Sequence, residues 1–212
     1  ADWPQYSEAL YRLQQAITHN TPHEMNVFVL GGSMTRGSTT YSACICQKNV
    51  DSTCPELMER SAETDCSWVT MLSRWLEKDI AVGNITITVH NLARSGAASH
   101  FMADIVADVL RLVAHTTTLS ANDMVIVDHS VNDISVYAEE LQMGFESLIR
   151  RLLHLTPDGA RPTIVVLEQH PIGTRRENVT RELQGSGDYA VIYREVCRHY
   201  GVLLWSLREV SW

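Results

Sequence analysis

Ser33 is the first residue of the chain whose surroundings in the sequence could support chemistry. It lies in the stretch VFVLGGSMTRGSTT, where four apolar residues run directly into Gly31 and Gly32. Such a serine has three interpretations: a tight turn, a nucleophile held at the end of a strand, or part of a phosphate-binding loop. The spacing of Gly32 and Gly37 fits such a loop, but Ser38 replaces the lysine that contacts the phosphates. This replacement argues against a nucleotide site.

Two further residues could form a site for acyl transfer together with Ser33. Attack of a serine hydroxyl on an ester gives a tetrahedral oxyanion, which needs hydrogen-bond donors around it. A loop glycine can bring its backbone N–H close because it has no side chain, and an asparagine amide is a second kind of donor. Gly96 and Asn132 are residues of these two types. In isolation, Asn132 and Asp133 would sooner be interpreted as a helix cap.

The segments that must position these residues alternate between strand and helix. Apolar, β-branched runs indicate strands, and helical spacing of apolar residues indicates helices. The predicted strands are 26–30, 85–90, 124–128, 163–168 and 202–206, and the predicted helices are 5–18, 66–78, 99–115, 137–155 and 188–200. Strands that are apolar throughout are typical of a parallel sheet with helices on both faces. We therefore predict one α/β domain over residues 1–212, a three-layer α/β/α sandwich with a mainly parallel five-stranded sheet and a cysteine-rich insertion at about 37–66.

The helix over 66–78 carries two more specific predictions. Asp65 is placed to cap its N-terminus. Trp68 and Trp75 are seven residues apart, which puts both on one face of the helix. We expect both tryptophans to pack in the core.

The ligand site of such a sheet lies beyond the carboxyl ends of the strands. Ser33, Gly96 and Asn132 each follow a predicted strand, so all three should meet at this edge. His170 closes the fourth strand at the same edge and is a candidate base, although a loop histidine is the simpler interpretation. His129 directly follows the third strand, and we expect it to be structural.

The residues at these strand ends resemble the sequence blocks of the SGNH (GDSL-like) hydrolases. Residues 31–35 (GGSMT) stand where the family has its serine block G-D-S-[LIT], residues 91–96 (NLARSG) are similar to N-x-[AG]-x-x-G, and residues 131–133 (VND) are similar to the end of G-x-N-D. Gly32 replaces the family's aspartate, and Ser130 replaces its glycine. The three blocks follow the family's order along the chain.

The resemblance implies a flavodoxin-like fold and a serine hydrolase mechanism. In it Ser33 attacks an ester carbonyl, and the Ser33 N–H, the Gly96 N–H and the Asn132 side chain form the oxyanion hole. No metal and no organic cofactor is implied. The family's fourth block, D-x-x-H, supplies the general base and the residue that orients it, but the chain contains no D-x-x-H. We expect these two groups on a segment beyond residue 212 or on a second chain, with His170 as the substitute available inside the chain.

The composition of the chain indicates which classes of partner it binds and in which cell compartment it folds. The net charge of −8 and the scattered basic residues argue against nucleic acid, and no apolar run reaches the about 18 residues that a membrane span needs. Four cysteines lie close together in a polar stretch, and we expect disulfides rather than a metal site among Cys44, Cys46, Cys54 and Cys66. Cys197 is then either a buried free thiol or paired with a cysteine beyond residue 212. Glycosylation sequons at Asn84 and Asn178 fit the same oxidising, secretory compartment.

These observations predict a secreted or lumenal esterase that acts on a small-molecule or carbohydrate ester. Removal of O-acetyl groups from carbohydrate is one substrate class that the resemblance implies. Two alternatives use the same fold: a protein that binds carbohydrate or another ligand without turnover, and an O-acyltransferase with the same serine. A D-x-x-H beyond residue 212 would favour the enzyme over the binding protein.

Overall fold

The protein is built on a five-stranded parallel sheet with the strand order β2-β1-β3-β4-β5. The computed structural model describes residues 8–32, 35, 67–133, 136–157, 161–168 and 187–206. The strands are β1 (His23–Gly31), β2 (Ile85–Asn91), β3 (Met124–Asp128), β4 (Thr163–Glu168) and β5 (Leu203–Ser206). The helices are α1 (Glu8–His19), α4 (Trp68–Trp75), the π-helical turn η4 (Leu76–Ile80), α5 (Ser99–Val113), α6 (Ser130–Asp133), α7 (Ala138–His154) and α9 (Gly187–Tyr200).

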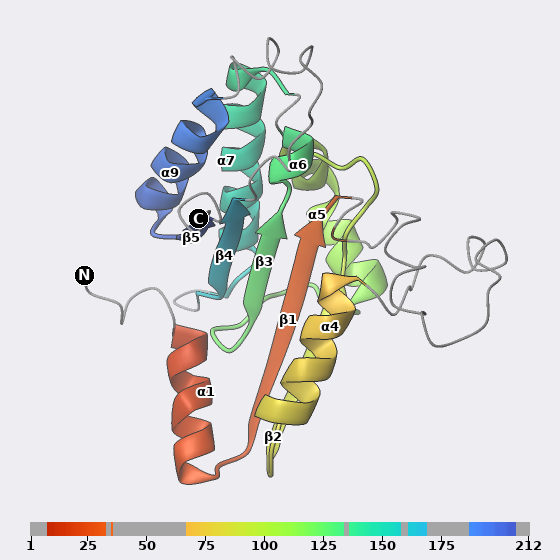
Figure 1. Cartoon of the computed structure of the whole chain (residues 1–212), viewed down its shortest axis with the longest axis vertical. Helices are drawn as coiled ribbons and strands as arrows, with labels where there is room; N and C mark the ends of the chain where they lie inside the picture. Colours follow the sequence, from red (N-terminus) through yellow and green to blue (C-terminus); the bar gives the residue numbers. More distant parts are fainter. Residues whose placement is uncertain are drawn as a thin grey trace, which may run out of the picture.

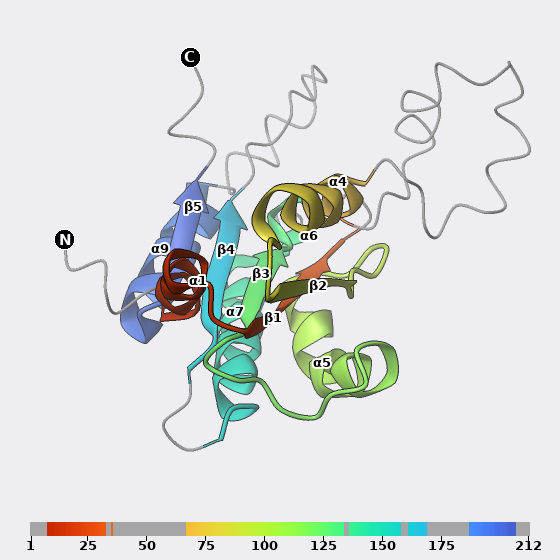
Figure 2. The same ribbon diagram turned by 90° about the horizontal axis from the view of Figure 1, so that it is seen from below.

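Helices cover both faces of this sheet, as the apolar strands predict (Figure 1). Figure 2 shows α1 and α4 on one face and α5, α7 and α9 on the other. The strand order is the flavodoxin-like one. The expected three-layer α/β/α sandwich with a parallel five-stranded sheet is therefore confirmed. Within the described part of the chain, no helix has both the length and the apolar character needed to span a membrane.

The alternation of β1 side chains explains why the strand is apolar throughout. Phe28 and Leu30 belong to the core that α5, α7 and α9 cover, whereas Val27 and Val29 belong to the core under α1 and α4. All four side chains are at most 2% exposed. Successive residues of a strand point to opposite faces, so a strand buried on both faces needs apolar residues at every position.

The N-terminus of α4 differs from the prediction. Ser67, not Asp65, is the N-cap, and its hydroxyl oxygen accepts a hydrogen bond from the Thr70 N–H at 3.1 Å. Asp65 lies outside the described residues. A serine at this position satisfies one of the backbone donors that every helix leaves free in its first turn.

The prediction that Trp68 and Trp75 both pack in the core is wrong for Trp75, which is 52% exposed. Trp68 is partly buried and packs against the core cluster under this helix, whereas Trp75 does not. Val69 is buried, and Leu72 and Leu76 pack beside it against the sheet, so the inward stripe runs through these three residues. Trp75 is turned about 100° away from Leu76, as successive helical residues are, and it therefore faces outward.

Cys197 is a buried free thiol on α9, the first of the two states expected for it. It belongs to the core cluster on the α5, α7 and α9 side of the sheet. Burial, together with the nearby Glu168 carboxylate, raises the pKa of the Cys197 thiol to about 12. The other four cysteines lie outside the described residues.

Helices α5 and α7 cross closely at Gly144. A Cβ atom on Gly144 would lie 2.4 Å from His100 Cβ and 2.7 Å from His100 Cα. Backbone cannot move aside as a flexible side chain can, so Gly144→Ala should overpack this crossing. We expect the overpacking to lower the free energy of unfolding by about 1–3 kcal/mol. The gain in helix propensity from glycine to alanine, roughly 1 kcal/mol, offsets only part of this loss. Chemical denaturation measures the loss.

The neighbouring variant Met143→Ala is the control for this crossing, because Met143 is 68% exposed. We expect its free energy of unfolding to stay within about 0.5 kcal/mol of the parent value. Equal stability of Gly144→Ala and the parent protein would contradict the close approach of α5 and α7.

Candidate functional site

The ends of β1, β2 and β3 lie side by side at the carboxyl edge of the sheet. Val29 pairs with Asn91 of β2, and Gly31 pairs with Asp128 of β3. The segments that follow these strands therefore meet, as the sequence predicts. Ser33 and His170, the predicted nucleophile and substitute base, both lie outside the described residues.

The Asn132 side chain packs directly against the backbone of Gly32. A Cβ atom on Gly32 would lie 2.3 Å from Asn132 Oδ1 and 2.9 Å from Asn132 Cγ. The amide thus occupies the space that any side chain at position 32 would need. Two of the three predicted sequence blocks are brought together here, at the residue that immediately precedes Ser33.

A buried hydrogen bond joins Thr35 to Asp128, the last residue of β3. The Thr35 hydroxyl donates to Asp128 Oδ2 at 2.7 Å, and both residues are buried. A Cβ atom on Gly31 would lie 2.1 Å from Thr35 Oγ1, so position 31 also requires a glycine. Sequence reasoning did not single out Thr35 or Asp128, although a carboxylate that ends an apolar strand is an available signal.

The segment after β2 continues alongside β1. The Leu92 N–H donates to the Val29 carbonyl at 2.8 Å, and the Arg94 N–H donates to the Gly31 carbonyl at 2.9 Å. Gly96 follows in the left-handed region with φ +75° and is exposed. No atom lies within 4 Å of the Cβ that it lacks, so the backbone conformation, not packing, calls for glycine here.

The short helix α6, which carries Asn132, is held by the residue that precedes it. The His129 carbonyl accepts hydrogen bonds from the Asn132 and Asp133 N–H groups, both at 2.9 Å. The His129 ring is fully buried, and its Nδ1 donates to the Ala97 carbonyl at 2.9 Å. His129 is therefore structural, as expected, and it connects α6 to the segment that contains Gly96.

Burial lowers the pKa of His129 below its usual 6.5, although Asp133 and Asp128 act in the opposite direction. Below about pH 6.5 the unfolded chain thus binds a proton that the folded protein resists, and the free energy of unfolding should fall as the pH drops. We expect His129→Asn, whose amide can still donate to Ala97, to show a weaker fall between about pH 7.5 and pH 5.5. Thermal denaturation at several pH values measures this. An unchanged pH dependence would show that His129 titrates alike in both states.

Asp133 is a second connection that sequence reasoning missed. Its carboxylate accepts hydrogen bonds from the Ser99 N–H at 2.7 Å and from the Ser99 hydroxyl at 2.5 Å. It also accepts one from the Tyr193 hydroxyl of α9 at 2.5 Å. All three residues are buried. The sequence does suggest a helix cap at Asn132–Asp133, and the structure shows that Asp133 accepts from the first backbone N–H of α5.

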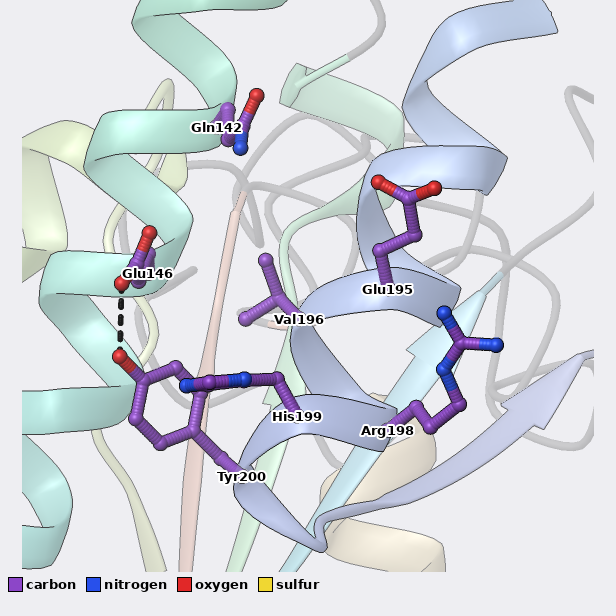
Figure 3. A pocket seen from close by; sticks show the side chains of 7 residues that line it. All are labelled: Gln142, Glu146, Glu195, Val196, Arg198, His199 and Tyr200. Atoms are coloured by element: carbon purple, nitrogen blue, oxygen red, sulfur yellow. Dashed lines mark hydrogen bonds between the residues drawn. The ribbon is translucent and has the colours of Figure 1, made fainter.

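A pocket of about 360 Å³ lies between α7 and α9, away from these strand ends (Figure 3). The Tyr200 hydroxyl donates to Glu146 Oε1 across it at 2.7 Å. The lining residues all belong to the two helices: Gln142, Glu146, Glu195, Val196, Arg198, His199 and Tyr200. None of them follows a strand at the carboxyl edge, so this pocket is separate from the candidate site.

Of the two predicted glycosylation sites, Asn84 lies within the described residues. Asn84 lies in an exposed turn before β2. Its carbonyl accepts a hydrogen bond from the His23 N–H at 3.1 Å, while the side chain faces solvent. Asn178 lies outside the described residues.

Comparisons with known proteins bear on the fold. No protein-family model matches the chain, and no curated protein matches its sequence. A solved two-domain esterase active on acetylated mannans shares 16% identity at a TM-score of 0.58, with 95% of this chain and 42% of that chain covered. Esterase EstA from Pseudoalteromonas shares 11% identity at a TM-score of 0.55, with coverage of 85% and 76%. A member of the lipolytic G-D-S-L family from Veillonella parvula shares 12% identity at 0.53, with coverage of 86% and 78%.

The chain has the fold of the SGNH esterases. The resemblance seen in the sequence blocks is thereby confirmed at the level of the fold. The chain spans 42% of the length of the mannan-active esterase, which has two domains. On this SGNH fold the described residues place Gly32, Gly96 and Asn132 after β1, β2 and β3, respectively.

Proposed function

We propose that this chain is the hydrolase domain of a serine esterase. Ser33 is the nucleophile, and the Ser33 N–H, the Gly96 N–H and the Asn132 amide hold the oxyanion. One observation carries the proposal: the Asn132 amide packs against Gly32, the residue before Ser33, at the carboxyl edge of a sheet with the SGNH fold. The esterases among the structural neighbours support the reaction type.

The chemistry would proceed in two steps. The Ser33 hydroxyl attacks the ester carbonyl carbon while a base takes its proton, and the carbonyl oxygen becomes an oxyanion between the donors. Collapse of this intermediate expels the alcohol, which receives the proton, and leaves an acyl-serine that water hydrolyses. Because the chain contains no D-x-x-H, we place the base on a segment beyond residue 212 or on a second chain, with His170 as the substitute inside the chain.

The proposed substrate is an acylated carbohydrate, with acetyl as the acyl group. One structural neighbour is an esterase active on acetylated mannans, which supports this choice. Sequons at Asn84 and Asn178 and the cysteines at 44–66 support a secreted or lumenal protein. Disulfides among those cysteines are part of the same proposal.

A serine-directed fluorophosphonate probe tests the nucleophile on the native protein. We expect covalent label at Ser33, located by mass spectrometry of the peptide, and no label in Ser33→Ala. The intact mass before and after reduction would show whether a disulfide-linked second chain is present. Absence of label in the protein as isolated, with no second chain, would overturn the esterase and favour a protein that binds ligand without turnover.

A further inference from the structure

Helix α5 begins without a cap of its own. Its N-cap residue is Ala98, which has no side-chain acceptor. The first turn of a helix leaves backbone N–H groups unsatisfied, and leaving them so is costly when they are buried. Here the Ser99 N–H donates to Asp133 Oδ1 at 2.7 Å. The cap of α5 is therefore supplied by α6, which follows 34 positions later in the chain.

The chemistry of Asp133 suits this position. Its three contacts all come from donors: the Ser99 N–H, the Ser99 hydroxyl and the Tyr193 hydroxyl. Burial raises the pKa of the Tyr193 phenol well above 10, so the phenol keeps the proton that it donates. A carboxylate accepts at both oxygens, whereas an amide would turn an NH2 group toward one of these donors. The positive end of the α5 dipole adds to the preference for a carboxylate.

A second buried connection runs parallel to the first. His129 Nδ1 donates to the Ala97 carbonyl, two positions before Ser99. The two connections thus join the start of α5, at 97 and 99, to the α6 segment, at 129 and 133. Gly96 lies directly before Ala97 in the α5 segment, and Asn132 lies between His129 and Asp133 in the α6 segment. The two proposed oxyanion donors are therefore on segments that are joined twice by buried hydrogen bonds.

We propose that Asp133 is a positioning residue that fixes the spacing between the Gly96 N–H and the Asn132 amide, with Tyr193 holding its carboxylate from α9. Its effect on catalysis rests on the esterase function proposed above. The clamp itself, formed by Asp133, Ser99 and Tyr193, is a property of the folded protein and can be measured without turnover.

The test compares Tyr193→Phe and Asp133→Asn with the matched control Tyr200→Phe. Tyr200 lies on the same helix, but its hydroxyl donates a hydrogen bond to Glu146 in the pocket between α7 and α9 (Figure 3). In both clamp variants we expect faster amide hydrogen exchange in peptides that cover 92–100 and 129–133. We expect kcat for an acetyl ester to fall by about 10-fold with KM little changed, because small displacements of catalytic groups are costly. The control should change neither quantity.

A double variant separates positioning from general loss of structure. If Asp133 acts through Asn132, Asp133→Asn should cost less than about 2-fold in kcat when Asn132 is already alanine. An undiminished loss in that background would overturn the positioning role. If Asp133→Asn fails to fold, hydrogen exchange and kcat of Tyr193→Phe still test the clamp.

Failure of the clamp and failure of the esterase proposal are distinguishable. Unchanged hydrogen exchange in Tyr193→Phe and Asp133→Asn would overturn the clamp whether or not the parent protein is active. A parent protein that neither hydrolyses esters nor takes the fluorophosphonate label would overturn the esterase, while exchange would still decide whether the clamp exists.

Discussion

Replacing Asn132 by alanine should lower the rate of ester hydrolysis by about 100- to 1000-fold, the usual cost of one oxyanion donor. The loss should appear in kcat more than in KM, because the donor interacts most strongly with the charge that develops in the transition state. The protein should stay folded. Asn132 is only half-buried, and its backbone N–H, which holds α6 to the His129 carbonyl, is kept in the variant.

The measurement is steady-state hydrolysis of an acetyl ester, with thermal denaturation of the same samples. Asn122→Ala is the matched control: it removes an asparagine from the turn before β3, at the opposite edge of the sheet, where Asn122 accepts a hydrogen bond from Arg12 at 3.1 Å. We expect the control to keep its activity. Near-parent activity in Asn132→Ala would remove Asn132 from the oxyanion hole.

Gly32→Ala should also be damaging, with a loss of about 100-fold in kcat, because displaced catalytic groups lose most of their effect. A methyl group at position 32 would overlap the Asn132 amide, whose Oδ1 would be 2.3 Å away. The amide must rotate or α6 must shift, and either movement displaces the group proposed as an oxyanion donor. Hydrolysis of the same acetyl ester measures the loss.

The double variant Gly32→Ala, Asn132→Ala gives a sharper result. Truncation of Asn132 removes the atoms that the new methyl group would meet, so the two losses should not add. We expect the double variant to be about as active as Asn132→Ala alone, in line with non-additivity between residues in contact. Fully additive losses would show that Gly32 acts through something other than Asn132.

Much of the fold could be predicted from local sequence alone. The bounds of β3 and β4, 124–128 and 163–168, agree with the prediction, because short runs of buried, β-branched residues end at sharp changes in composition. The parallel sheet follows from the apolar residues at successive positions of these strands. The placement of Gly96 and Asn132 after β2 and β3, the two strands that flank β1, follows from the topology, since all strands of such a sheet end at one edge.

The contacts that hold the site could not be predicted in the same way. Asp133 meets Ser99 34 positions away and Tyr193 60 positions away, so no local pattern reveals that it caps α5. Trp75 shows a related limit. Its spacing from Trp68 predicts a common environment, but in the packed structure Trp68 lies against the core with Val69 and Leu72, whereas Trp75 is exposed.

The position of β1 inside the sheet, between β2 and β3, has a consequence for how the chain folds during synthesis. Val27 pairs with Val89 of β2 on one side and with Met124 of β3 on the other, so β1 leaves the ribosome long before either neighbour. At about 5–20 residues per second, the chain between Val27 and Met124 takes roughly 5–20 s to appear. For that interval at least one edge of this apolar strand has unpaired backbone N–H and C=O groups and is open to misassociation. We therefore expect a chaperone that binds exposed apolar strands to protect β1 in the nascent chain.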